Sequence, residues 1–305
     1  MKELLSGNEA LARGALEAGI EIACGYPGTP SSEILENVAK YKEIYSEWSV
    51  NEKVAMDAAA GAAYSGRRSM VTTKQVGMNV LSDSLFYTAY TGAEAALVVI
   101  TADDPGLFSS QNEQDTRMVG RAAMIPVIEP SDSEEARVFT KRAYEISEEY
   151  DTPIILRTTT RLAHSQGIVN LEDRVEVEDK PYERNVAKNV MMPGNAIKAH
   201  VRVEERMKRL EKDACTLDIN KVEYNDTSIG IITSGIPYQY VKEALPNASV
   251  LKLGMVHPLA KDLIKEFASK VDRVVVVEEL EPVIEEQVKA MGIECDGKNL
   301  FTIQG

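Results

Sequence analysis

The sequence predicts two α/β units with parallel sheets, joined by a connecting segment. The chain has 305 residues, the length of about two domains at roughly 150 residues each. Short apolar runs alternate with helical stretches in residues 1–160 and again in residues 227–305. This alternation is typical of parallel sheets that helices cover on both faces. Residues 161–226, which lie between the two units, are rich in charge and hold little apolar core of their own.

The first unit is expected to open with a helix, a strand and a turn. Ser6-Gly7-Asn8-Glu9 matches a capping box, so a helix should begin there and end near Gly19. Residues 20–24 read as a strand, and Gly25-Tyr26-Pro27-Gly28-Thr29-Pro30 reads as a turn. We expect Thr29 to cap the next helix, with Pro30 at its first position, where a missing N–H costs nothing.

Strands and helices continue to alternate along the chain. A strand should precede Asn51, which opens an Ala-rich helix that ends near Gly66. The remaining strands of the first unit are predicted at residues 69–73, 95–101, 126–129 and 153–157. The connecting segment contains a charged helix at 196–211. In the second unit we predict strands at 228–233, 249–253, 273–277 and 300–303, and helices at 237–245, 258–268 and 282–291.

Charge and hydrophobicity exclude several classes of function. The chain carries 34 basic and 48 acidic residues, a net charge of −14, which argues against non-specific binding of nucleic acid. Its longest apolar runs, 95–100 and 274–277, are far shorter than the roughly 20 residues that span a bilayer. The first residues lack the apolar core of a signal peptide. We therefore expect a cytoplasmic protein with no nucleic-acid or membrane partner.

The cysteines and histidines show no metal-ligand spacing. Cys24, Cys215 and Cys295 are far apart and form no CxxC pair, which fits a reducing compartment. Three cysteines also cannot hold a four-cysteine iron–sulfur cluster. His164, His200 and His257 are scattered, so no metal site is expected on this chain.

Three places are candidates for chemistry. The turn at residues 25–30 follows a strand and precedes a helix, where α/β sheets bind ligands, although a plain rigid turn would have the same sequence. Glu52 heads the Ala-rich helix; the helix dipole alone would favour an acid there, but the small residues behind it allow close approach of a cofactor. The polar loop at 102–117 has the length of a functional loop, or is a surface loop only.

Together these places resemble motifs of the thiamine-diphosphate-dependent 2-oxoacid:ferredoxin oxidoreductases. Within that family the chain resembles the N-terminal half of the α subunit of indolepyruvate ferredoxin oxidoreductase, and the 102–117 loop is the most specific part of the likeness. The likeness covers essentially all 305 residues. The motifs that carry it are Gly25–Glu33, Asn51–Ala55, Lys74–Asn79 and Ala102–Arg117, with Arg161, His164–Ser165 and Glu278–Pro282.

The resemblance implies a fold, a reaction and a catalytic residue. Residues 1–160 would form a pyrimidine-binding domain, 161–226 a connecting segment, and 227–305 a domain similar to the C-terminal domain of transketolase. The implied reaction is oxidative decarboxylation of an aryl 2-oxoacid, indolepyruvate, to an acyl-CoA, with electrons passed through iron–sulfur clusters to ferredoxin. The Glu52 carboxyl would face N1′ of the aminopyrimidine and favour the tautomer that removes the thiazolium C2 proton.

The resemblance also implies residues that line the cofactor and the substrate. The cofactor-binding residues would be Glu52, Gly25, Pro27 and Asn79. The Thr29 hydroxyl corresponds to a group that approaches the substrate carboxylate. The other implied substrate residues are Gln111, Asn112, Asp115 and Arg117, of which Arg117 carries a guanidinium suited to a carboxylate.

The chain departs from the family's α subunit in what it lacks. It has no GDG motif for Mg²⁺ and diphosphate, and no paired cysteines for [4Fe–4S] clusters. Either the polypeptide is a shortened one or the missing parts lie on separate chains. The implied partners are a diphosphate-binding domain or subunit, a β subunit, ferredoxin, coenzyme A and the 2-oxoacid. Two alternatives remain open at this stage: a subunit of a non-oxidative thiamine-diphosphate-dependent 2-oxoacid decarboxylase, and a non-catalytic fragment or assembly subunit.

Overall fold

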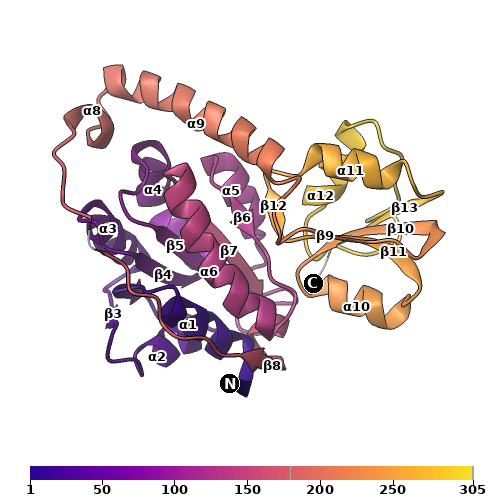
Figure 1. Cartoon of the computed structure of the whole chain (residues 1–305), viewed down its shortest axis with the longest axis horizontal. Helices are drawn as coiled ribbons and strands as arrows, with labels where there is room; N and C mark the ends of the chain where they lie inside the picture. The colour runs from indigo at the N-terminus through magenta and orange to yellow at the C-terminus, as the bar shows by residue number, and fades with distance from the viewer. Residues whose placement is uncertain (179, 304–305) are drawn as a thin grey trace.

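Two α/β units lie side by side in the structure, a computed structural model that describes residues 1–178 and 180–303 (Figure 1). The first unit is built on a seven-stranded sheet of order β12-β6-β7-β5-β4-β2-β3. All of its pairings are parallel except that of β12 with β6. The predicted α/β class is therefore confirmed. The strands are β2 (Ile22–Gly25), β3 (Tyr45–Trp48), β4 (Ser69–Lys74), β5 (Leu97–Asp103), β6 (Val127–Ile128), β7 (Ile154–Thr159) and β12 (Met255–His257).

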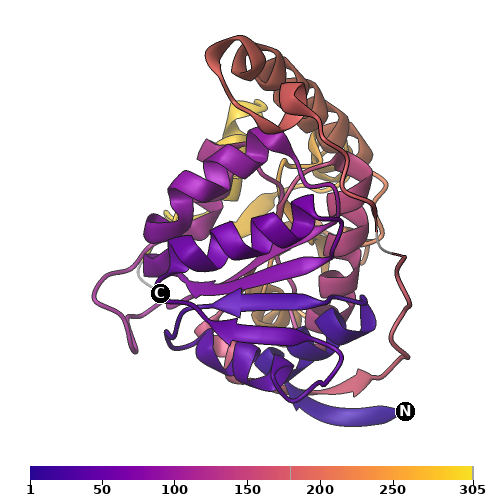
Figure 2. The ribbon, with the colours of Figure 1, turned by 90° about the vertical axis from the view of Figure 1, so that its left-hand side faces the viewer.

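Helices cover both faces of this sheet, which lies between them in Figure 2. One face packs against α1 (Gly7–Glu17), α2 (Ser32–Val38) and α6 (Ser133–Tyr150), and this core includes Leu11 and Tyr144. The other face packs against α3 (Glu52–Tyr64), α4 (Gln75–Thr91) and α5 (Thr116–Ala123), with Met56 and Met78 in the core. Central strands such as β5 are buried along their whole length, which explains why they read as continuous apolar runs.

The local signals at the helix starts are confirmed at two of three positions. The Ser6 hydroxyl accepts a hydrogen bond from the Glu9 N–H, and the Glu9 carboxylate accepts one from the Ser6 N–H, so the capping box forms. Asn51 caps α3 by accepting from the Val54 N–H at 2.9 Å. The prediction that Thr29 caps the following helix is wrong, because α2 begins only at Ser32, after a cis Thr29–Pro30 bond.

An antiparallel ribbon and several elements of the connecting segment were not predicted from the sequence. β1 (Lys2–Ser6) pairs with β8 (Gln166–Asn170), so the residues before the capping box are a strand. The predicted charged helix is α9 (Pro193–Asp213), whose apolar side contacts α4 of the first unit. The segment also contains α7 (Thr160–His164), α8 (Val186–Asn189) and β9 (Lys221–Glu223).

The second unit is a four-stranded sheet of order β13-β10-β11-β9. Helix α10 (Pro237–Ala244) packs against one face through Val241, and α11 (Lys261–Ala268) and α12 (Val283–Ala290) pack against the other. The expected strand at 300–303 is wrong: the chain turns there, with Leu300 N–H bonded to the Gly297 carbonyl, and Asp296 instead forms a bridge to Val275. The remaining strands are β10 (Asp226–Ser234), β11 (Ala248–Leu253) and β13 (Val274–Val277).

The two units share a strand and a core. β12 comes from the second half of the chain, yet it pairs with β6 at the edge of the first sheet. One buried apolar cluster runs from Met56 and Met78 of the first unit to Leu251 and Phe267 of the second. No helix within 1–178 and 180–303 is long and apolar enough to cross a membrane.

Candidate active site

The junction of β4 and α4 brings the three predicted places together. β4 ends at Lys74, and α4 begins at Gln75, at the carboxyl edge of the parallel sheet where ligands bind in such folds. The Lys74 ammonium donates to the Ser109 carbonyl at 3.0 Å, and the Gln75 amide donates to the Asn112 carbonyl at 3.3 Å. The loop at 102–117 is therefore tied directly to this junction.

The turn at residues 25–30 lies on the other side of the same junction. The Gly28 N–H donates to the Ser32 hydroxyl at 2.8 Å, and the Ser31 hydroxyl donates to the Gly28 carbonyl at 2.7 Å, so the turn is closed by the two serines that follow it. This closure, rather than a cap from Thr29, precedes α2. Thr29 is exposed, and its carbonyl accepts a hydrogen bond from the Ser109 hydroxyl at 3.1 Å.

Gly28 has no side chain, and this leaves room for the stem of Lys74 from the β4–α4 junction. A Cβ placed on Gly28 would lie 2.8 Å from Cδ of Lys74 and 3.1 Å from its Cγ. The stem of Lys74 therefore crosses the turn where Gly28 has no side chain.

Glu52 faces the junction from α3. It is the first residue of that helix and half-buried. A Cβ on Gly77 would lie 2.5 Å from Glu52 Oε1 and 2.2 Å from Thr73 Oγ1, so the carboxylate is packed over a glycine of α4. Within the described part of the chain the Glu52 carboxylate has neither a hydrogen bond nor an ion pair. A half-buried acid without a protein partner is free to bond a ligand.

The loop at 102–117 is held in shape by Asp104. Its carboxylate accepts hydrogen bonds from the Ser109 N–H, the Ser110 hydroxyl and the Thr160 hydroxyl, each at 2.7 Å. Burial acts to raise the pKa of Asp104, but these hydrogen bonds outweigh it and hold the pKa below its usual range. An ionised Asp104 thus anchors a loop that would otherwise be loosely held.

The other predicted site residues divide into exposed and buried groups. Asn79 is exposed on α4, and Gln111 and Asn112 are exposed in the loop, so all three are accessible to a ligand. Pro27 is exposed in the turn, whereas Gly25 is buried at the end of β2.

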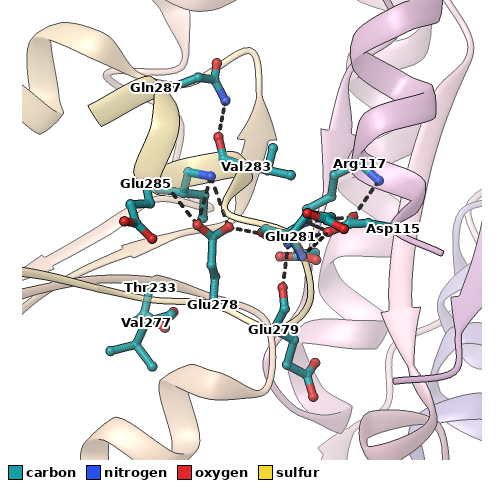
Figure 3. A network of polar contacts seen from close by, with 12 residues as sticks. Asp115, Arg117, Thr233, Val277, Glu278, Glu279, Glu281, Val283, Glu285 and Gln287 are labelled. Carbon is teal, nitrogen blue, oxygen red and sulfur yellow. Dashed lines mark hydrogen bonds and ion pairs between the residues drawn. The ribbon is translucent and has the colours of Figure 1, made fainter. Parts of the chain in front are cut away.

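Asp115 and Arg117 lie in a buried network between the two units (Figure 3). Arg117 is fully buried; its Nε donates to Asp115 at 2.9 Å and its Nη1 to Glu278 at 2.7 Å. Its Nη2 donates to the carbonyls of Glu279 and Glu281 at 2.6 and 3.0 Å. The expectation that Arg117 anchors a substrate carboxylate is therefore corrected: its guanidinium is enclosed by protein and clamps the second unit to α5.

The same network continues into the first sheet. Arg157, on β7, pairs with Asp103 at 2.6 Å and with Glu129. Burial acts to raise the pKa of Asp115, but Arg117 and Arg157 hold it at about 2. For Asp103 burial dominates and the pKa is raised.

The residues that the sequence analysis did not single out as site residues are Lys74, Gln75 and Gly77. Gln75 is buried, and its Oε1 has no hydrogen-bond partner in the described structure. The signal for all three was the Lys-Gln-Val-Gly sequence directly after a buried strand. No group of three or more His, Cys, Asp or Glu residues in the described ranges is arranged to hold a metal ion.

Comparisons with known proteins give the family. Residues 13–225 match the model of pyruvate flavodoxin/ferredoxin oxidoreductase, thiamine-diphosphate-binding, and residues 242–297 match the indolepyruvate oxidoreductase domain. The chain is 44% identical to indolepyruvate oxidoreductase subunit IorA of Archaeoglobus fulgidus, over 97% of this chain and 50% of that protein. It is 45% identical to the IorA subunit of Methanothermobacter thermautotrophicus, over 95% of this chain and 48% of that protein.

A solved structure shows the same fold. It is 2-oxoglutarate:ferredoxin oxidoreductase from Magnetococcus marinus with 2-oxoglutarate, coenzyme A and succinyl-CoA bound. The TM-score is 0.78 and the identity 17%, over 97% of this chain and 61% of that one. The chain spans about half the length of the curated relatives it matches.

Proposed function

The chain belongs to the pyruvate flavodoxin/ferredoxin oxidoreductase family of thiamine-diphosphate-binding proteins, and on that basis we propose that it supplies the pyrimidine side of an indolepyruvate:ferredoxin oxidoreductase. The proposed reaction converts an aryl 2-oxoacid to an acyl-CoA and passes electrons to ferredoxin. The observation that carries the proposal is the unpartnered Glu52 carboxylate over Gly77, at the carboxyl edge of the sheet. The family does not favour the alternative of a non-oxidative decarboxylase.

The residues of this chain fit one half of a thiamine diphosphate site. When bound, thiamine diphosphate supplies an electron sink for the loss of CO₂ from a 2-oxoacid. Glu52 would hold a proton between its carboxylate and N1′ of the pyrimidine, acting as an acid–base group. Gly77 gives the carboxylate its room, because any side chain there would displace Oε1. Gly25, Pro27 and Asn79 are the further cofactor-lining residues of this proposal.

The turn and the loop would shape the substrate side. The Thr29 hydroxyl would approach the substrate carboxylate from the exposed turn, and Gln111 and Asn112 would line the pocket from the loop. Asp115 would act from the network behind the loop, where it positions the start of α5.

The rest of the active site would come from outside these residues. We place the Mg²⁺ and diphosphate ligands on a diphosphate-binding domain or subunit, and the [4Fe–4S] clusters elsewhere in the complex. This assignment is supported by the sequence, which has no GDG motif and three cysteines without paired spacing. Coenzyme A, ferredoxin and a β subunit complete the proposed partners, in a reducing, cytoplasmic setting.

The test is Glu52→Gln in the complex assembled with its partner chains. Turnover of indolepyruvate, measured as viologen or ferredoxin reduction, should fall by at least about 100-fold, because acid–base groups contribute factors of that size. Stability should change by no more than about 1 kcal/mol, since only the helix-dipole contribution of Glu52 is lost.

Glu286→Gln is the matched control. Glu286 is an exposed acid in the first turn of α12, so like Glu52 it lies near the start of a helix, but in the second unit. The control should keep full turnover. Near-normal turnover in Glu52→Gln would contradict the proposal.

A further inference from the structure

Lys74 is a cation in the candidate site with little to neutralise it. Its stem crosses Gly28, and its Nζ reaches the Ser109 carbonyl at 3.0 Å. Ser109 in turn donates through its hydroxyl to the Thr29 carbonyl at 3.1 Å. The ammonium therefore lies where the turn and the loop meet, beside the residue expected to face the substrate.

An ammonium has three donors, and the structure uses one of them here. Within the described residues no carboxylate lies within 4.0 Å of Lys74 Nζ. Asp104 is close enough to act on the charge, but its own oxygens are occupied by Ser109, Ser110 and Thr160. Two donors of Lys74 thus remain open to an anion.

The neighbouring cations are committed elsewhere. Lys53, next to Glu52, pairs with Asp83 at 2.7 Å. Arg117 is enclosed in the network with Asp115 and Glu278. Of Lys53, Lys74 and Arg117, it is Lys74 that has no ion pair within the residues that the structure describes.

We propose that the Lys74 ammonium binds the carboxylate of the 2-oxoacid, next to Thr29, and that Gly28 sets its path. The inference rests on the proposed function, which requires a carboxylate within reach of the cofactor. The same short segment supports it, because Gly77, over which Glu52 packs, is three residues from Lys74 on α4. Burial lowers the pKa of Lys74, so its charge is partly desolvated and attracts an anion more strongly than a surface lysine does.

The proposal predicts an effect on KM rather than on kcat. The negative charge leaves the carboxylate as CO₂ forms, so the ion pair is strongest in the ground state. In the assembled complex, Lys74→Met should raise KM for indolepyruvate about 10- to 100-fold, the range expected for a hydrogen bond to a charged group. Lys74→Arg should restore part of the loss, and KM for coenzyme A should stay within about twofold.

An inhibitor pair separates charge recognition from a structural effect. Indole-3-propionate lacks the 2-oxo group, and its amide replaces the carboxylate by a neutral group of nearly the same size, in which an NH₂ donor takes the place of one oxygen. Wild type should bind the acid more tightly than the amide, and Lys74→Met should lose that preference. Lys40→Met is the matched control, because Lys40 is exposed after α2 and its ammonium donates to the Asn37 side chain; it should leave both constants unchanged.

Three results would overturn the inference. They are an unchanged KM for indolepyruvate in Lys74→Met, a rise in KM for coenzyme A alone, or an acid preference that survives in the variant. Failure of the proposed function would look different, because the wild-type complex would then show no turnover of the 2-oxoacid.

Discussion

Replacing Arg117 with Met tests whether the buried network joins the two units. Arg117 is fully buried, and the side chains of Asp115 and Glu278 are each 1% exposed. The substitution keeps most of the length of the stem but leaves two buried carboxylates without their guanidinium. Arg157 lies 3.8 Å from Asp115 and still stabilises the charge of that carboxylate, so the loss of Arg117 should affect Glu278 most.

The expected cost follows from this burial. Breaking a buried ion pair by removing one partner costs about 3–5 kcal/mol, which is a large share of the roughly 5–15 kcal/mol that stabilises a protein domain. Adding Glu278→Gln should recover part of the loss, because the remaining amide no longer carries an uncompensated charge.

Urea unfolding with two probes measures the effect and its location. Trp48, the single tryptophan, lies on β3, so its fluorescence reports the first unit, whereas far-UV circular dichroism reports both. Wild type should unfold with coincident transitions, and in Arg117→Met the two should separate. Arg209→Met is the control: this arginine is 54% exposed and pairs with Glu149 on the surface, so its loss should cost at most about 1 kcal/mol.

The pH dependence gives the variant a second signature. Without Arg117 the folded-state pKa of Glu278, already raised by burial, should rise further. An acid whose folded pKa is raised adds stability at low pH and loses it as the pH rises, so the deficit of the variant should shrink from pH 8 to pH 5. A loss below about 1 kcal/mol with coincident transitions would show that Arg117 does not join the two units, because removing one partner of a buried ion pair costs more than that.

Two further predictions concern single residues. Gly77→Ala should lower turnover of the assembled complex at least about 10-fold, because the new Cβ would meet Glu52 and Thr73. For the same reason it should not gain the roughly 1 kcal/mol of stability that replacing Gly by Ala usually adds to a helix. Full activity together with raised stability in urea unfolding would contradict this prediction. His257 is half-buried, its two ring nitrogens are buried without a hydrogen bond in the described structure, and burial, aided by Arg121, lowers its pKa to about 4. Between pH 7 and pH 4 the unfolded chain therefore binds a proton that the folded chain does not. The free energy of unfolding of wild type, measured in urea, should fall by up to about 3 kcal/mol over this range because of His257, and His257→Leu should lack this part of the fall.

The sequence predicted correctly those features that depend on hydrogen bonds between residues only a few positions apart. The capping box at Ser6 and the cap at Asn51 are bonds across three positions, and both formed as expected. The turn at 25–30 was also located correctly, but its closure was not. Ser31 stands at the N-cap of α2, but its hydroxyl bonds the Gly28 carbonyl and makes no cap, and the Ser32 hydroxyl accepts from the Gly28 N–H.

The prediction of Glu52 as the acid at the cofactor stays a prediction, whereas that of Arg117 as the substrate anchor is wrong. Glu52 was singled out from its helix position and the family resemblance, and it faces Gly77. Arg117 was assigned to the substrate because a guanidinium suits a carboxylate. Its partner Glu278 is 161 residues away in sequence, so no local pattern could show that the pair would form.

Periodicity, caps and motifs are local properties of the chain, and they were enough to predict the class of fold and the family. Only the tertiary structure decided which charges are shared between the units and which remain free. It buried Arg117 against Glu278, placed β12 in the first sheet, and laid Lys74 across Gly28. The physical reason is that a charged side chain pairs with the groups that folding brings within a few ångströms of it, and those groups lie far away in sequence.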